Sequence, residues 1–317
     1  MAEFKEAIEP FGLNSQERAK TTFSRIGVVG CGREGQNVVR QAASAGLEVI
    51  FLELSQDKIE VALNNISRSL DTKVENWGLT TGEKKTILSR IVGTMNYEDL
   101  HDCDFVIECT RHESETGERN NGLRKEVFHK LEEVLAKDAI IATNASTVII
   151  SELAADLHYK ERCISLHFLV SQPDAKILEI VKGIYTSEDT YKRVMTLAKM
   201  IKHDVINVQE SAGLVSVRMF AVMLNEACQM LMENVTTKEE IDRLICTGWG
   251  HRLGVFRTAD VIGIGKMVAL MNNMYNEYGD KKYVPSPILK RLFRAKQLGV
   301  STGSGFYQYD ADGKIIR

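Results

Sequence analysis

The sequence predicts an α/β domain built on a parallel, doubly wound sheet, followed by an all-helical domain. Between residues 25 and 166, short apolar segments alternate with helical stretches, which is the order of a parallel sheet with helices on both faces. A glycine-rich turn joins the first apolar segment to the first helical one. After Ser211 no further strand is expected, and helical patterns cover residues 214–232, 238–245 and 258–278.

The first unit of the sheet is predicted between residues 25 and 53. A polar leader, residues 1–24, precedes it. Residues 25–30 are typical of a short buried strand, residues 36–46 of a helix that a glycine closes at its C-terminal end, and residues 47–53 of a second strand. The order strand, glycine turn, helix, strand is that of a βαβ unit.

The next segment, residues 56–92, is longer than one crossover requires. It keeps a helical periodicity with a break at Gly78, which predicts an inserted hairpin of two helices projecting from the sheet. The polar residues 110–122 are typical of a flexible surface loop. Further strands are expected at residues 105–108, 139–143 and 162–166, with helices at residues 125–135 and 148–157.

Composition excludes several classes of function. The chain has 317 residues, of which 44% are hydrophobic and 26% charged, as in ordinary globular proteins of about two domains. A net charge of −3 argues against a protein that neutralises nucleic-acid phosphates. The six cysteines are scattered, which favours a reducing compartment. Residues 1–24 lack a secretory pattern, and no stretch approaches the ~18 apolar residues of a membrane span. We therefore expect a cytoplasmic protein without a nucleic-acid or membrane partner.

The glycine turn has the pattern of a dinucleotide site. It reads Gly30-Cys-Gly32-Arg33-Glu34-Gly35. The first glycine permits the tight bend, the second lets the backbone approach a pyrophosphate, and the third allows the helix to pack closely on the strand. Glu53 ends the next predicted strand 18 positions after Gly35. Its carboxylate would accept hydrogen bonds from the adenosine ribose and repel a 2′-phosphate, which predicts NAD rather than NADP. The alternative is a glycine turn that serves packing alone.

A candidate catalytic pair, His167 and Glu179, lies twelve positions apart. His167 follows the predicted strand 162–166, and ligands bind at the carboxyl ends of such strands. An isolated histidine there is often structural, but a carboxylate on one ring nitrogen would stabilise the imidazolium formed when the other nitrogen takes a proton. Glu179 could otherwise be a surface strand residue. With His167 as the base and Glu179 as its partner, we expect Glu179→Gln to slow turnover less severely than His167→Gln.

Ser146 is a further candidate at the same edge of the sheet. It follows a predicted strand in Asn144-Ala-Ser146 and could offer a hydroxyl to the substrate oxygen. Alternatively, Ser146 or Thr147 caps the next helix. His101 and Cys103 have no further ligand nearby in the sequence, so no metal site is expected.

Several of these stretches resemble the L-3-hydroxyacyl-CoA dehydrogenases, from Ser24 to Tyr309. The family's Leu-His-Phe-Phe-Asn-Pro…Lys-Leu-Val-Glu is similar to residues 166–179, with the same interval from histidine to glutamate. Its Asn-Thr-Ser-Ser resembles residues 144–147, and its Pro-Ser-Pro and Thr-Gly-Glu-Gly-Phe-Tyr resemble residues 285–287 and 302–307.

The resemblance implies a Rossmann-type NAD domain (residues 25–210) and a helical domain (residues 211–317) that forms a homodimer and helps to bind substrate. It implies conversion of a 3-hydroxyacyl-CoA to the 3-ketoacyl-CoA by hydride transfer, with His167 as base, Glu179 orienting it and Ser146 assisting. The implied cofactor residues are Gly30, Gly32, Arg33, Glu34, Gly35, Glu53, Arg124 and Asn144. The implied substrate residues are Ser69, Lys73 and Ser146.

The chain also departs from the family. Val170 and Val217 stand where the family has asparagines, the latter in Ala212-Gly-Leu-Val-Ser-Val-Arg218 against Pro-Gly-Phe-Ile-Val-Asn-Arg. Arg124 replaces a lysine, and His112 aligns with an acidic residue. Two alternatives therefore stay open: a dehydrogenase of another hydroxy acid or amino acid derivative, and a weakly catalytic NAD- or acyl-CoA-binding protein. Acyl length, reaction direction and the role of residues 110–122 are left undetermined.

Overall fold

A computed structural model describes residues 23–110, 121–169 and 175–316. Val170, His112 and most of the leader and of the 110–122 segment lie outside these ranges. One eight-stranded sheet runs in the order β3-β2-β1-β4-β5-β6-β7-β8, and only the β6–β7 pair is antiparallel. The strands are β1 Arg25–Val29, β2 Glu48–Leu52, β3 Ile91–Thr94, β4 Phe105–Glu108, β5 Ile140–Thr143, β6 Cys163–Phe168, β7 Ile177–Lys182 and β8 Asp204–Gln209.

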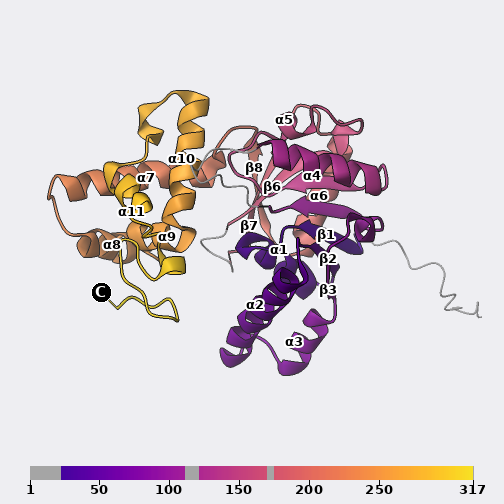
Figure 1. The fold of residues 1–317 in the computed structure, drawn as a ribbon, viewed down its shortest axis with the longest axis horizontal. Coiled ribbons are helices and arrows are strands. Elements are labelled where there is room, and N and C mark those ends of the chain that lie inside the picture. The colour runs from indigo at the N-terminus through magenta and orange to yellow at the C-terminus, as the bar shows by residue number, and fades with distance from the viewer. Residues whose placement is uncertain (1–22, 111–120, 170–174, 317) are drawn as a thin grey trace, which may run out of the picture.

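Helices cover both faces of the sheet, so the predicted doubly wound fold is confirmed (Figure 1). Side chains alternate between the faces along each strand. Val28 belongs to the buried cluster under α1, α2 and α6, and its neighbour Val29 to the cluster under α4 and α5. The helices are α1 Arg33–Ser44, α2 Gln56–Glu75, α3 Thr81–Leu88, α4 Asn121–Val134, α5 Ile150–Ala154 and α6 Glu188–Met200.

The predicted helical hairpin is confirmed as α2 and α3, which project together from the sheet (Figure 1). Ser55 caps α2, and Thr80 with Glu83 forms a capping box on α3. Three strands were not expected: β3, β7 and β8. The helical periodicity assigned to residues 56–92 masked the start of β3. β3 and β8 are the edge strands, which are less apolar than central ones because one side of each is unpaired.

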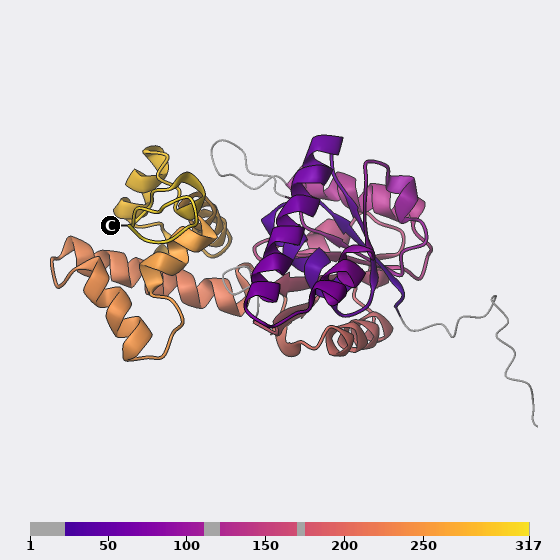
Figure 2. The same ribbon diagram turned by 90° about the horizontal axis from the view of Figure 1, so that it is seen from below.

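The C-terminal region is helical, as expected, and stands beside the sheet (Figure 2). Its own buried cluster includes Leu224, Phe256 and Met271. The helices are α7 Leu214–Met232, α8 Lys238–Thr247, α9 Val255–Ile262, α10 Ile264–Tyr278 and α11 Pro287–Arg294. Within the described ranges, α7 alone is long and apolar enough to cross a membrane by length and composition. That apolar length was not anticipated, and α7 also packs against α9 and α10 in the helical cluster.

The glycine-rich C-terminal segment, residues 302–309, packs against this helical region. The buried carboxylate of Asp260 accepts hydrogen bonds from Phe306 N (2.9 Å), Tyr307 N (3.0 Å) and the Tyr309 hydroxyl (2.8 Å). Gly305 permits this approach, because a Cβ there would lie 2.0 Å from Asp260 Oδ1. Burial raises the pKa of Asp260, and these donors act against that rise. The tail is thus fixed by one buried anion.

Candidate active site

The glycine turn lies between β1 and α1, beside the point where the strand order reverses between β1 and β4. Ligands of doubly wound folds bind at such a point. Gly30 has φ 87°, and a Cβ on Gly35 would lie 2.1 Å from the Gly30 oxygen. Gly32 caps the N-terminus of α1 and has open space where its side chain would be. An anion can therefore approach the amides in the first turn of α1.

Glu53 lies next to this turn. Its Oε1 accepts a hydrogen bond from Cys31 N at 2.6 Å, and its Oε2 one from Leu54 N at 3.2 Å. Glu53 is only half-buried, which leaves its carboxylate within reach of a ligand. The turn and this carboxylate fit the diphosphate and ribose of a dinucleotide.

Arg33 and Glu34, on the same turn, contact the helical domain. Arg33 donates to the carbonyls of Val261 and Ile262 at the end of α9. Glu34 pairs with Lys266 of α10 and accepts from Asn144 Nδ2 at 2.9 Å. Burial, with Arg33 nearby, lowers the pKa of Lys266 to about 7. These contacts join the turn to α9 and α10.

A buried carboxylate that sequence reasoning missed, Glu108, ends β4 beside the turn. It is fully buried and forms an ion pair with Arg124. It also accepts hydrogen bonds from Thr110 N and the Thr143 hydroxyl, both at 2.7 Å. Arg124 Nη2 donates to the Thr110 carbonyl at 2.9 Å. The predicted cofactor residue Arg124 is therefore engaged with Glu108. An acidic residue ending the apolar run Phe-Val-Ile was the signal in the sequence.

His167 and Glu179 meet in the structure. His167 lies inside β6 rather than after it, so the predicted end of that strand was wrong. β6 and β7 are antiparallel, and their register pairs His167 with Glu179. Residues opposite each other present side chains on the same face of a sheet. His167 Nδ1 lies 2.7 Å from Glu179 Oε2, and both residues are buried. The hairpin register explains the interval of twelve residues.

The start of α7 surrounds the Glu179 carboxylate. Its Oε1 accepts from Val215 N at 3.0 Å and Ser216 N at 2.9 Å, and its Oε2 accepts from Ser216 Oγ at 2.6 Å. Burial alone would raise the pKa of Glu179, but the hydrogen bonds from His167 and Ser216 outweigh it and lower that pKa. Glu179 is thus an anion held by four donors. Sequence reasoning missed Ser216, although it lies in the stretch compared with the family.

Ser146 is buried in the loop after β5, and its carbonyl accepts a hydrogen bond from Gly213 N at 2.7 Å. This contact links the loop to the start of α7, beside the donors to Glu179. The N-cap of α5 is Ile149, and it makes no side-chain cap bond. The expectation that Ser146 or Thr147 caps this helix is therefore wrong.

Ser69 and Lys73 lie four residues apart on α2, a spacing that puts them on one face of the projecting hairpin. Ser69 is exposed and Lys73 half-buried. A phosphate or a polar ligand tail could reach them from solvent. Among the described residues no cluster of three or more His, Cys, Asp or Glu side chains is suited to hold a metal.

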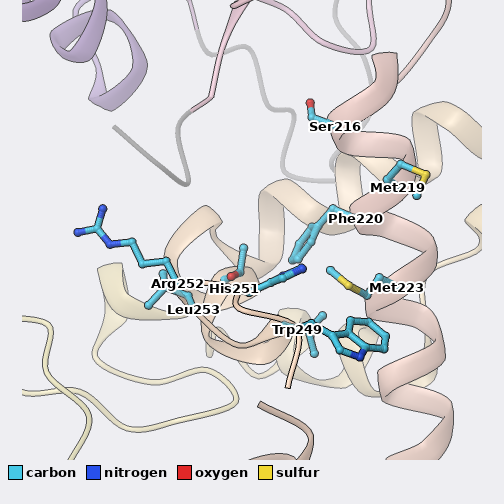
Figure 3. A pocket seen from close by; sticks show the side chains of 10 residues that line it. Ser216, Met219, Phe220, Met223, Trp249, His251, Arg252 and Leu253 are labelled. Carbon is cyan, nitrogen blue, oxygen red and sulfur yellow. The ribbon is translucent and has the colours of Figure 1, made fainter. Parts of the chain in front are cut away.

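A largely apolar cavity of about 490 Å³ begins at Ser216 (Figure 3). It runs along α7 past Met219, Phe220 and Met223 and is bordered on the other side by the α8–α9 loop, where Trp249 and His251 lie. Its volume is within the range of ligand pockets. Ser216 therefore both lines the cavity and donates a hydrogen bond to Glu179.

Two family models match the chain. The NAD-binding domain of 3-hydroxyacyl-CoA dehydrogenase matches residues 25–211, and the C-terminal domain of the same family matches residues 213–309. A 3-hydroxybutyryl-CoA dehydrogenase from Clostridioides difficile is 35% identical over 286 residues, which cover 90% of this chain and 99% of the relative.

Solved structures agree. FadB2 of M. tuberculosis has a TM-score of 0.85 at 29% identity, and the (S)-3-hydroxybutyryl-CoA dehydrogenase PaaH1 of Ralstonia eutropha has 0.80 at 32%. Each match covers 91% of this chain and 99% of the other. With a Rossmann-type NAD-binding domain and a helical C-terminal domain, the chain belongs to the 3-hydroxyacyl-CoA dehydrogenase family of NAD-dependent oxidoreductases.

Proposed function

We propose that this protein interconverts a 3-hydroxyacyl-CoA and the corresponding 3-ketoacyl-CoA. The observation that carries the proposal is the buried pair of His167 and Glu179, with Nδ1 and Oε2 2.7 Å apart, in the same domain as the glycine turn. Relatives named 3-hydroxybutyryl-CoA dehydrogenase support the substrate class. NAD, when bound at Gly30, Gly32, Gly35 and Glu53, supplies the hydride acceptor.

In this reaction His167 acts as the general base. Glu179 accepts a hydrogen bond from the Nδ1–H group of the ring, so Nε2 carries the lone pair that takes the proton of the substrate 3-hydroxyl. The imidazolium formed is stabilised by the charge of Glu179. Ser146 donates a hydrogen bond to the reacting oxygen from the loop after β5. In the reverse direction the imidazolium returns the proton to the 3-keto oxygen.

The substrate is held in two places. The acyl group lies in the cavity along α7, whose walls are mainly apolar. The coenzyme A part extends toward Ser69 and Lys73 on α2. Asn144 is held by Glu34 and by Phe168 N, 2.9 Å from its Oδ1, and this network fixes the loop that carries Ser146.

The domain boundary falls at residues 210 and 211, between β8 and α7.

The protein is also proposed to be a cytoplasmic homodimer. Met219, Val222 and Trp249 are 71%, 40% and 64% exposed. They line an adjoining groove of about 860 Å³ on α7 and α8, which shares Met219 and Trp249 with the acyl cavity. Apolar patches of this kind mark interaction surfaces. A two-fold pairing of α7 with a second copy would bury them.

A second candidate follows from Val217, which replaces a family asparagine. Val217 packs against the buried cluster of the helical domain, and a site without the amide suits a hydroxy acid that is less dependent on hydrogen bonds at this point. A panel of hydroxy acids and amino acid derivatives, free and as CoA esters, separates the two candidates. Faster turnover of a free acid would favour the second.

The test of the first proposal is oxidation of NADH with acetoacetyl-CoA. We expect turnover by the wild-type protein and its near loss in His167→Gln, with NAD affinity unchanged because the cofactor contacts lie on the glycine turn. A His167→Gln variant that keeps more than about a tenth of the rate contradicts the role of the base. It would favour a protein that binds NAD or acyl-CoA without efficient turnover.

A further inference from the structure

We propose that the Ser216 hydroxyl is a positioning residue that restrains the basicity of the His167–Glu179 pair. The inference rests on the proposed function of that pair. Ser216 Oγ donates to Glu179 Oε2, the oxygen that also faces His167 Nδ1. One carboxylate oxygen therefore serves two donors, at 2.6 and 2.7 Å.

The backbone conformation at the start of α7 positions the Ser216 hydroxyl. The N-cap of α7, Gly213, has no side chain to cap the helix, so Glu179 itself accepts the N–H groups of Val215 and Ser216. Gly213 and Leu214 have φ angles of 87° and 49°, an unusual left-handed entry into a helix. The left-handed φ of Gly213 favours glycine there, and a Cβ at this position would also lie 2.3 Å from Met274 Sδ. Ser216 is thereby held within hydrogen-bonding distance of the carboxylate. It is the uppermost of the labelled side chains that line the cavity (Figure 3).

At this position the chain differs from the family stretch given in the sequence comparison. The family stretch quoted above has valine at the position of Ser216 and asparagine at the next position, whereas this chain has Ser216 and Val217. Successive residues of a helix point about 100° apart. A polar side chain at position 216 therefore lies on a different side of α7 from one at position 217, and it is Ser216 that reaches Glu179.

The physical effect has a definite sign. A hydroxyl that donates to Oε2 takes up part of the negative charge that would stabilise the imidazolium. Without the Ser216 hydroxyl, the full negative charge on Glu179 Oε2 acts on His167, which then binds its proton more tightly. The neutral base needed for oxidation appears only at higher pH, so the acidic limb of the kcat/KM profile should move upward.

The neighbouring charges do not compete for this effect. His167 on β6 is the only titratable side chain hydrogen-bonded to Glu179 in the described parts of the chain. From α7, Arg218 donates to the Tyr283 hydroxyl at 2.9 Å and stacks on Tyr278. From β8, the residue opposite Glu179 is Ile206, which is apolar. At the end of β7, Lys182 pairs with Glu188.

The experiment measures kcat/KM for oxidation of 3-hydroxybutyryl-CoA against pH in three variants. Ser216→Val and Ser216→Ala should shift the acidic limb upward by about half to one pH unit, with kcat on the plateau changed less than about tenfold. Ser216→Thr keeps the hydroxyl and should restore the wild-type limb. Thr196→Val is the matched control, because its hydroxyl donates to the Lys192 carbonyl within its own helix, far from Glu179 in the sequence.

Two outcomes overturn the inference. Either Ser216→Val and Ser216→Ala keep the wild-type limb, or Ser216→Thr shifts it as much as Ser216→Val does. If one variant fails to fold, the other two still decide the question. Failure of the proposed function gives a different result, because His167→Gln then retains activity. If only the inference fails, His167→Gln is inactive and the Ser216 variants keep the wild-type pH profile.

Discussion

The change from Glu179 to glutamine tests the catalytic pair most sharply. Oε1 accepts from two main-chain N–H groups, those of Val215 and Ser216, so a glutamine must place its carbonyl oxygen there. Its NH₂ group then faces His167 Nδ1 and donates to it. The ring must carry its proton on Nε2, the nitrogen that should accept the substrate proton. The base is therefore blocked as well as deprived of charge, and the expected loss is larger than the sequence alone suggests.

The magnitude follows from the role of the base. General base catalysis contributes about 10²- to 10⁴-fold, so the loss of kcat should correspond to about 3 to 5 kcal/mol. A wrong tautomer acts on chemistry and not on cofactor binding, so NAD affinity should stay the same. What activity remains should have its acidic limb at lower pH, opposite in direction to the variants of Ser216.

Stopped-flow measurement of NADH formation during oxidation of 3-hydroxybutyryl-CoA is the assay. Calorimetric titration with NAD and thermal unfolding are the controls for an intact fold. A Glu179→Gln variant that keeps more than about a tenth of the wild-type rate refutes the reasoning, because the tautomer would not be controlled by this carboxylate.

Three further predictions concern cofactor, assembly and substrate. Glu53 should make NAD bind at least about tenfold tighter than NADP, since a 2′-phosphate would meet its carboxylate; equal affinities in a titration contradict this role. Light scattering should give a dimer, twice the 35.6 kDa of one chain, that Val222→Glu dissociates and Val61→Glu, on exposed α2, does not; a wild-type monomer at micromolar concentration refutes the pairing. Met223→Trp should fill the cavity and lower kcat/KM for longer acyl groups more than for acetoacetyl-CoA, because each buried methylene contributes about 0.8 kcal/mol, or about fourfold. Met232→Trp, at the far end of α7, is its matched control, and an equal loss at every chain length would show that the acyl group lies elsewhere.

Local patterns in the sequence predicted strands β1, β2, β4, β5 and β6, the glycine turn, the helical hairpin and the candidate residues His167 and Glu179. The inner strand β7 was missed. These features have local signals: apolar runs bounded by turns, glycines at fixed spacing, and a break in periodicity at Gly78. The edge strands β3 and β8 lacked such a signal, because an edge strand needs fewer apolar residues to be stable in the sheet.

Which side chains come into contact depends on the folded chain. Glu108 and Arg124 lie 16 positions apart, and Glu179 and Ser216 lie 37 apart. Their pairing depends on strand order and on the angle at which α7 enters, neither of which any local pattern contains. The structure also gave Arg33 and Glu34 partners in the helical domain, at Ile262 and Lys266. A side chain's residue type indicates what it can bind, but only the packed backbone determines which donor or acceptor lies within hydrogen-bonding distance.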